Sequence, residues 1–318
     1  MSVIEVLVEG FNRVLSAGKI ILWVYLFSFF LVLGPTLIVS EMIEESLGQS
    51  LVAEDLSTGF NDAWYREFRS ATKGFGESFR FSIAGVGAIL DGVDAFLSGK
   101  IFQETLAVLC LGILYLASWI FLSGGVLHLY TTNAPVTFEH FMKGAGIYFF
   151  RFLRLAVIAG LFYWLIYFYL LPFLGDLVQE HTREAIDERV AFLWMLAKYL
   201  VVLIFLIFVN LIVDYTKIIT VTKRQRSVLL AIVESFRFVL GNVGRTLSLY
   251  MVIGLLGVFF LCLYGLLAPG GLQHSWIGVM WALVLGQIYI LSRIWIRLLF
   301  IASQSALCRT ISFRQYLS

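Results

Sequence analysis

Charge is scarce in this chain of 318 residues. Only 14% of the residues are charged, whereas soluble globular proteins carry about 25%. Apolar residues make up 60% of the chain, and the mean hydropathy is +0.90. This composition excludes a disordered chain, an acidic solvating tail and an ordinary cytosolic enzyme, and it predicts that most of the chain lies in lipid.

Cysteine and histidine are also scarce, and neither is spaced as a metal site requires. The three cysteines are an odd number without paired spacing, which argues against a disulfide framework and against a zinc site. The four histidines lie on separate segments, and the HExxH, GxSxG and Walker A motifs are absent. We therefore expect no cofactor, no metal and no enzymatic activity. The residues concerned are Cys110, Cys262, Cys308, His128, His140, His181 and His274.

Long runs without charge predict six transmembrane helices, because about 20 helical residues cross the hydrocarbon core of a membrane. The last run, Thr246–Ser292, is too long for one helix, and we expect the segment around Pro269 to divide it. The first run exceeds the apolar part of a signal peptide, so we interpret it as a retained span. The fold class is therefore all-α, a polytopic membrane helical bundle that forms a single integral membrane domain over residues 1–318. The expected spans are Ile20–Ser40, Leu106–Tyr130, Leu155–Gly175, Val190–Val213, Thr246–Leu267 and Trp276–Ile296.

Lysine and arginine are distributed unevenly about these spans. With the N-terminus inside, most of the 23 basic residues but a minority of the 21 acids fall on inner segments. Because basic residues favour the cytoplasmic side, we expect a multi-pass protein of the inner (plasma) membrane with both termini cytoplasmic. Residues 41–104 then form an extracytoplasmic helical insertion between the first two spans. Within it, residues 81–97 are either a helix on the membrane surface or a re-entrant segment that lines a cavity.

An internal repeat is indicated by similar segments on the inner side. Ser2–Leu15 and Ser227–Leu240 are identical at seven of fourteen positions when aligned without gaps. Val136–Arg154 matches Ser227–Arg245 in pattern more than in identity. We expect three units, each with an inner helix, an outward span and a returning span, related by rotation about the membrane normal. Their bounds are 2–130, 136–213 and 227–300.

Each copy of the inner segment places apolar residues at i, i+3, i+4 and i+7. In the first copy Val3, Leu7, Phe11 and Val14 lie on one face of a helix. This spacing is typical of an amphipathic helix that lies in the headgroup plane with its apolar face toward the lipid. The bundle is therefore expected to carry amphipathic interfacial helices on its cytoplasmic face.

The region from Asn210 to Val252 has the most distinctive sequence. Asp214, Tyr215 and Lys217 end the fourth span, and Ser235-Phe236-Arg237 and Gly241 follow in the next inner segment. This region resembles the basic membrane-surface helix and the following span in the membrane domain of bacterial glycerophosphodiester phosphodiesterases, a pattern shared by uncharacterised six-span bacterial membrane proteins. The soluble barrel of those enzymes, with its acidic and histidine metal ligands, is absent from this sequence. The resemblance therefore implies architecture and not phosphodiesterase activity.

Charged residues in or beside the spans are candidate functional residues, because charge is costly in hydrocarbon. Lys198 lies eight residues into the fourth span, about 12 Å deep at 1.5 Å per residue; it either reaches the interface or forms a paired interior site. Asp214 and Lys217 are three residues apart and can pair on a helix. Arg293 and Arg297 are one turn apart, and they contact either lipid phosphates or Asp214.

A short basic cluster follows the fourth span. Lys223, Arg224 and Arg226 come just after the apolar run, and each basic residue near anionic lipid contributes about 1 kcal/mol of attraction. We expect these residues to anchor the chain to anionic lipids of the inner leaflet and not to nucleic acid. Two uncharged polar residues, Asn210 and Gln287, are expected to make hydrogen bonds between helices.

Two classes of function fit these observations. The leading hypothesis is a non-catalytic inner-membrane scaffold, or a subunit of a larger assembly with a membrane protein partner. The alternative is a transporter or permease-like protein for a lipid or small amphiphile. A continuous polar cavity that reaches Lys198 would favour transport, whereas a solid apolar bundle would favour the scaffold.

Overall fold

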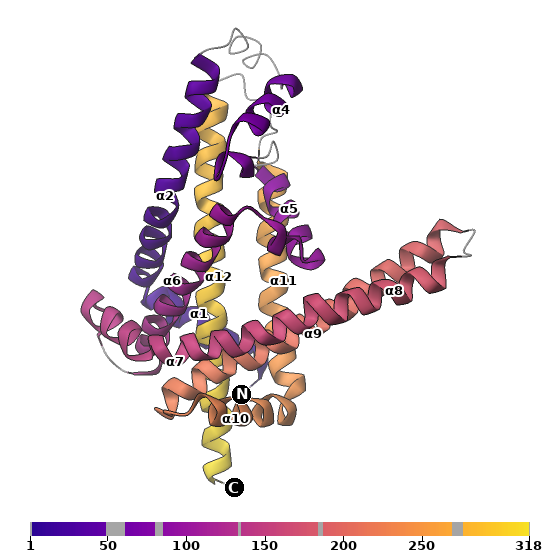
Figure 1. Ribbon diagram of the computed structural model, residues 1–318. Coiled ribbons are helices and arrows are strands. Elements are labelled where there is room, and N and C mark those ends of the chain that lie inside the picture. Colours follow the sequence, from indigo (N-terminus) through magenta and orange to yellow (C-terminus); the bar gives the residue numbers. More distant parts are fainter. Residues whose placement is uncertain are drawn as a thin grey trace.

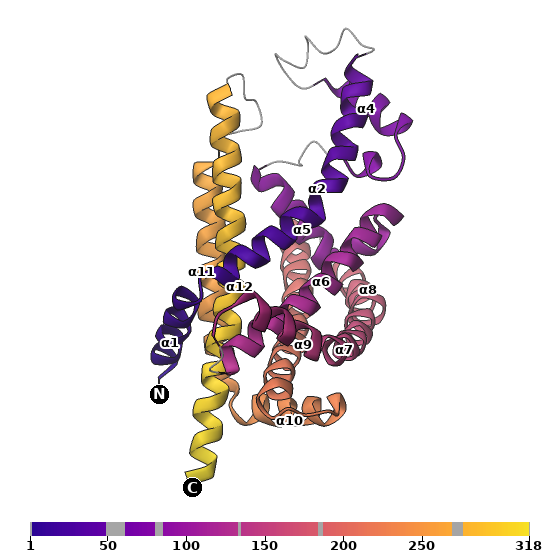
Figure 2. The same ribbon diagram turned by 90° about the vertical axis from the view of Figure 1, so that its left-hand side faces the viewer.

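The computed structural model describes residues 2–48, 61–79, 85–132, 135–183, 187–268 and 276–317, and within these ranges it contains helices and no strand. The elements are α1 (Val3–Ser16), α2 (Lys19–Gly48), α4 (Asp62–Ala71), η1 (Gly76–Ser78), α5 (Gly85–Ser98), η2 (Lys100–Gln103), α6 (Leu106–Thr131), α7 (Phe138–Leu165), η3 (Ile166–Leu170), α8 (Leu171–Thr182), α9 (Glu188–Thr222), α10 (Val228–Gly241), α11 (Val243–Leu267) and α12 (Trp276–Leu317). Helices α2, α11 and α12 rise steeply, α8 and α9 run at a shallow angle to them in Figure 1, and both termini lie toward the end opposite α4 (Figures 1 and 2).

Six of these segments are long and apolar enough to cross a membrane, so the chain is a multi-pass membrane protein. Each contains the span that the sequence predicts and extends beyond it at one or both ends. The division near Pro269 is confirmed in that α11 ends at Leu267 and α12 begins at Trp276, while residues 269–275 lie outside the described part. The six segments are Lys19–Gly48, Leu106–Thr131, Phe138–Thr182, Glu188–Thr222, Val243–Leu267 and Trp276–Ile311.

The insertion between the first two spans is helical where it is described. Helix α2 continues through Pro35 to Gly48, so the insertion begins as an extension of the first span. The Trp64 indole of α4 donates a hydrogen bond to Ser46 Oγ at 3.0 Å, which ties α4 to the end of α2. Helix α5 contacts α11, where an added Cβ at Gly265 would lie 3.3 Å from Val86. Residues 81–84 of the segment at 81–97 lie outside the described part.

The buried core lies toward the end of the bundle that holds the termini. The fully buried large side chains of the main cluster come from α2, α6, α7, α9, α11 and α12 and include Phe141, Tyr215 and Leu298. The outer parts of the spans expose their apolar side chains, as lipid-facing helices do. Helix α8 and the outer half of α9 extend as an arm away from α2, α11 and α12 (Figure 1).

Helices α1 and α10 bury equivalent positions of the gapless alignment. In α1 the buried residues are Val6, Gly10 and Val14, and in α10 the aligned residues Ala231, Ser235 and Val239 are buried. Helix α1 packs on α12 and α10 packs on α9. Both helices also expose the same four aligned apolar positions, which are Ile4, Val8, Phe11 and Leu15 in α1 and Leu229, Val233, Phe236 and Leu240 in α10.

Both helices also begin and end alike. A capping box begins α1, since the Ser2 hydroxyl accepts from the Glu5 amide and the Glu5 carboxylate accepts from the Ser2 amide. The C-cap residues Ala17 and Asn242 occupy aligned positions and share a ψ of 32°. The chain therefore turns at the same point of the first and the third unit before the next span begins.

The middle unit differs from the other two, and this corrects the expected boundary inside it. Helix α7 runs unbroken from Phe138 to Leu165, so no turn separates the expected inner helix at 136–154 from the span at 155–175. The positions aligned with Gly241 and Asn242 are Phe150 and Arg151. Neither residue is a helix breaker, and the helix therefore continues through them. The threefold repeat as a whole stays a prediction.

Helix α1 is fixed to the bundle by charged contacts. Arg13 donates to the Tyr130 carbonyl at 2.9 Å, at the C-terminal end of α6. Glu9 contacts both Arg13, at 3.2 Å, and Arg309 of α12, at 3.1 Å. Burial, followed by the nearby Arg309 charge, lowers the pKa of the Arg13 guanidinium from its ordinary value.

Candidate functional site

A polar cavity of about 460 Å³ lies between α6, α9, α11 and α12. Its α9 residues are near the end of that helix that leads to α10; Lys217 is five residues before Thr222, roughly 7.5 Å at 1.5 Å per residue. The cavity therefore lies in the part of the bundle near the termini. Three charged side chains line it, Asp214, Lys217 and Arg297, together with Tyr115, Trp119, Ser123, Asn210, Tyr250 and Gln304.

Helix α9 supplies one acidic and one basic group to this cavity. Asn210, Asp214 and Lys217 are spaced i, i+4 and i+7, which places them on one face of the helix. The expected pairing is confirmed, since Lys217 Nζ lies 3.6 Å from Asp214 Oδ1. The side chains of Asp214 and Lys217 remain 32% and 18% exposed, and what they face is the cavity.

Helix α12 supplies a second basic group, for which the described residues provide no acidic partner. Arg297 Nη1 lies 2.6 Å from the Tyr115 hydroxyl, and the guanidinium carbon lies 4.9 Å from the centroid of the Trp119 ring. Among the described residues Arg297 forms no ion pair, so the contact with Asp214 that the sequence suggested as an alternative is not formed. With Asp214 neutralised by Lys217, the cavity is left with one positive charge in excess.

A buried amide completes the lining. Gln304 is 1% exposed; its side-chain amide interacts with the Asp214 carboxylate, and within the described part of the chain its Oε1 makes no hydrogen bond. A buried polar group without a partner is costly, typically about 1–3 kcal/mol. The Gln304 carbonyl oxygen is thus an acceptor that water or a bound polar group can satisfy.

The other polar residues of the spans make contacts between helices. The Tyr163 hydroxyl of α7 donates to Asn210 Oδ1 at 2.7 Å, and the Tyr25 hydroxyl of α2 donates to Gln287 Oε1 at 2.7 Å. The expectation that Asn210 and Gln287 hydrogen-bond across helices is confirmed.

Two of the expected site residues lie away from the cavity. Lys198 is half-buried and does not line it; its Nζ lies 4.5 Å from the centroid of the Tyr199 ring. Arg293 is exposed, with its guanidinium 5.9 Å from the centroid of the Tyr289 ring.

The basic cluster after α9 lies on the surface beside α10. Lys223 and Gln225 both contact the Glu234 carboxylate. Arg224 has a φ of 50°, in the left-handed region, and Arg226 is exposed.

Of all the site residues expected from the sequence, the structure brings together three in the polar cavity, which are Asp214, Lys217 and Arg297.

Sequence reasoning missed the aromatic and amide lining of the cavity. Tyr115 and Trp119 are one turn apart in a uniformly apolar span, which contains no signal for the face they occupy. Gln304 lies between Ser303 and Ser305 in the long α12 helix. That group of polar residues inside a helix was a signal that could have pointed to the site.

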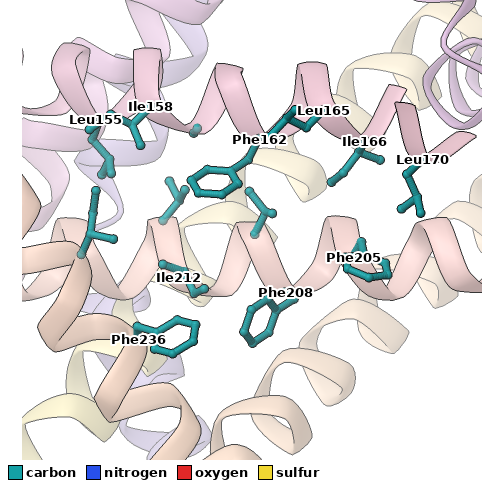
Figure 3. Close-up of a pocket in the computed structure, with 14 residues that line it drawn as sticks. Leu155, Ile158, Phe162, Leu165, Ile166, Leu170, Phe205, Phe208, Ile212 and Phe236 are labelled. Carbon is teal, nitrogen blue, oxygen red and sulfur yellow. The ribbon is translucent and has the colours of Figure 1, made fainter. Parts of the chain in front are cut away.

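A second cavity, on the other face of α9, is entirely apolar. It encloses about 420 Å³ between α7, η3, α9 and α10. Side chains of α7 and α9 point toward each other across it, and Phe236 of α10 lies at one end (Figure 3). The π-helical segment η3 precedes Pro172, which lacks an N–H and clashes with the preceding turn, so the helix widens here.

Comparison with known proteins finds no relative for this chain: no family model, no curated protein and no solved structure matches it. The resemblance of residues 210–252 to the membrane domain of glycerophosphodiester phosphodiesterases stays a prediction from sequence. Within the described residues, no group of three or more His, Cys, Asp and Glu side chains could hold a metal ion.

Proposed function

We propose that the protein is a non-catalytic protein of the bacterial inner membrane that binds, in the polar cavity, an amphiphile with one anionic group. The observation that carries this proposal is Arg297, a cation without an acidic partner among the described residues, which contacts the Tyr115 hydroxyl and the Trp119 ring. A guanidinium binds carboxylate or phosphate with two parallel hydrogen bonds. Lys217 and the amide of Gln304 line the same space.

Electrostatics and position both support an anionic ligand that comes from the membrane. The excess positive charge lies in a region of low dielectric, where charge interactions are stronger than in water. The cavity opens between helices whose outer surfaces are apolar. An amphiphile could thus keep its tail in lipid while its headgroup contacts Arg297.

The test is binding of oleate or lysophosphatidylglycerol to the purified protein, with lysophosphatidylcholine as the zwitterionic comparison. We expect Arg297→Gln to weaken binding of the anionic ligands by about tenfold or more, because loss of a desolvated charge partner costs about 2–5 kcal/mol. Arg293→Gln is the matched control, since Arg293 is one turn away on the same helix and does not line the cavity. Equal binding by the two variants would contradict the proposal.

A scaffold or assembly subunit remains a second candidate, favoured by the arm formed by α8 and the outer half of α9. Its exposed side chains are large and apolar, among them Phe173, Phe192 and Ile204. A membrane protein partner would bury this surface. If no anionic ligand binds above the zwitterionic comparison, this candidate takes precedence.

The proposed orientation places both termini and α10 in the cytoplasm, as the excess of basic residues on inner segments favours. The test uses single cysteines at Ser70 in α4 and at Arg226 after α9, both exposed, in a background without native cysteines. We expect an impermeant thiol reagent to label intact spheroplasts at position 70 and not at position 226. The reverse labelling, or equal labelling of both, would overturn the orientation.

A further inference from the structure

The apolar groove between α7 and α9 has the walls of a hydrocarbon site. The fourteen side chains that line it are all apolar, and most are Leu, Ile, Val and Phe. Its α7 and η3 wall runs from Leu155 to Leu170, roughly 22 Å at 1.5 Å per residue. Tightly packed membrane helices instead meet through small residues that allow close backbone approach. Ala159 is the one small residue in this lining, so the walls suit a flexible chain better than a helix.

One end of the groove leads to a basic residue. Ile232 and Phe236 of α10 line the groove and also border a shallow hollow that includes Arg237. Helix α10 crosses beneath the long helices at the end of the molecule nearer the C-terminus (Figures 1 and 2). An arginine on such a helix lies where a lipid headgroup would meet it.

Arg237 is available to an external anion. Its side chain is exposed, and among the described residues it forms no ion pair. The neighbouring carboxylate, Glu234, already contacts Lys223 and Gln225. The positive charge of Arg237 therefore complements an anionic group at the end of the groove.

We propose that this groove is a specific site for an anionic phospholipid, with one acyl chain between α7 and α9 and the phosphate at Arg237. The site lies on the opposite face of α9 from the polar cavity and shares no lining residue with it. The proposal therefore does not depend on the function assigned to the cavity. Ordinary lipid contact would be unsaturable and without headgroup preference, whereas this groove is expected to bind one lipid saturably and to prefer anionic headgroups.

The experiment is native mass spectrometry of the delipidated full-length protein, titrated with phosphatidylglycerol or with phosphatidylcholine of the same acyl chains. We expect one tightly bound phosphatidylglycerol, with phosphatidylcholine about tenfold weaker. Arg237→Gln should remove that preference and leave phosphatidylcholine binding unchanged. The matched control is Arg245→Gln, an exposed arginine at the start of α11 that lines none of the cavities described above.

A second variant, Ala159→Phe, places a ring inside the groove and should weaken both lipids alike. Equal binding of the two lipids by the wild-type protein would overturn the proposal, as would equal effects of Arg237→Gln and Arg245→Gln. The groove could instead hold a second copy of the chain. In that case the wild-type protein would form a dimer that Ala159→Phe abolishes, and this result would also overturn the proposal.

Discussion

Replacing Gly125 by leucine is expected to cost about 3 kcal/mol or more of folding stability, because α6 and α7 meet there without room for a side chain. A Cβ added at Gly125 would lie 2.6 Å from the Phe141 carbonyl oxygen and 2.8 Å from its ring. A backbone carbonyl cannot rotate away as a side chain can, so the helices must separate. Overpacking a dense interface costs typically 1–3 kcal/mol and more when the backbone must shift.

The same helix offers a matched control for this change. Gly112 lies in α6, and an added Cβ there would meet nothing within 4 Å. Both substitutions remove a glycine from one helix and add the same side chain, so their helix propensities change equally. The measurement is the thermal midpoint of each variant in detergent, followed by size-exclusion fluorescence. A similar midpoint for both variants would show that the α6–α7 contact does not limit stability.

The close packing of α6 and α7 also shows what the sequence could and could not predict. Span positions followed from composition, since a run such as Leu106–Tyr130 has no other fold available in lipid. The sequence around Gly124 and Gly125 indicates a helix but not which neighbour it meets. Apolar residues surround α6 on every side, so periodicity contains no information about the buried face.

Helix boundaries on the inner side were predictable where a breaker occurs. Gly18 follows the end of α1, and Gly241 and Asn242 end α10. The middle copy has Phe150 and Arg151 at the aligned positions, and its helix continues. Similar apolar patterns thus gave two separate inner helices and one continuous helix, because the local breakers and not the pattern decide where a helix ends.

The candidate site was predictable in its charges but not in its location. Asp214 and Lys217 are three residues apart, so their pairing required no tertiary information. Depth in the span drew attention to Lys198, which faces the Tyr199 ring away from the polar cavity. Arg297 enters the cavity because α12 packs beside α6 and α9. Its hydrogen-bond partner Tyr115 is 182 residues away in the chain, and no local pattern specifies such a contact.

The Asp214→Asn variant is expected to destabilise the empty protein and to tighten its binding of anions. In the native protein the Asp214 carboxylate offsets one of two cations, Lys217 and Arg297, that line the same cavity. Asparagine keeps the size of the side chain and removes its charge, leaving two like charges in a region of low dielectric. Removing one partner of a buried pair costs about 3–5 kcal/mol, and the partial exposure of both side chains to the cavity reduces this to roughly 1–2 kcal/mol.

An anionic ligand would restore the balance that Asp214→Asn removes, so stability and affinity should change in opposite directions. We expect the thermal midpoint of the variant to fall without ligand and to recover with oleate by more than the wild type does. The control is Asp214→Asn combined with Lys217→Met, which removes both charges of the pair and should restore the midpoint without ligand, because the remaining Arg297 charge is then as unopposed as in the native cavity. If oleate raised the midpoints of the single variant and the wild type equally, Asp214 would not compete with a ligand for these cations, and the cavity would not be the anion site.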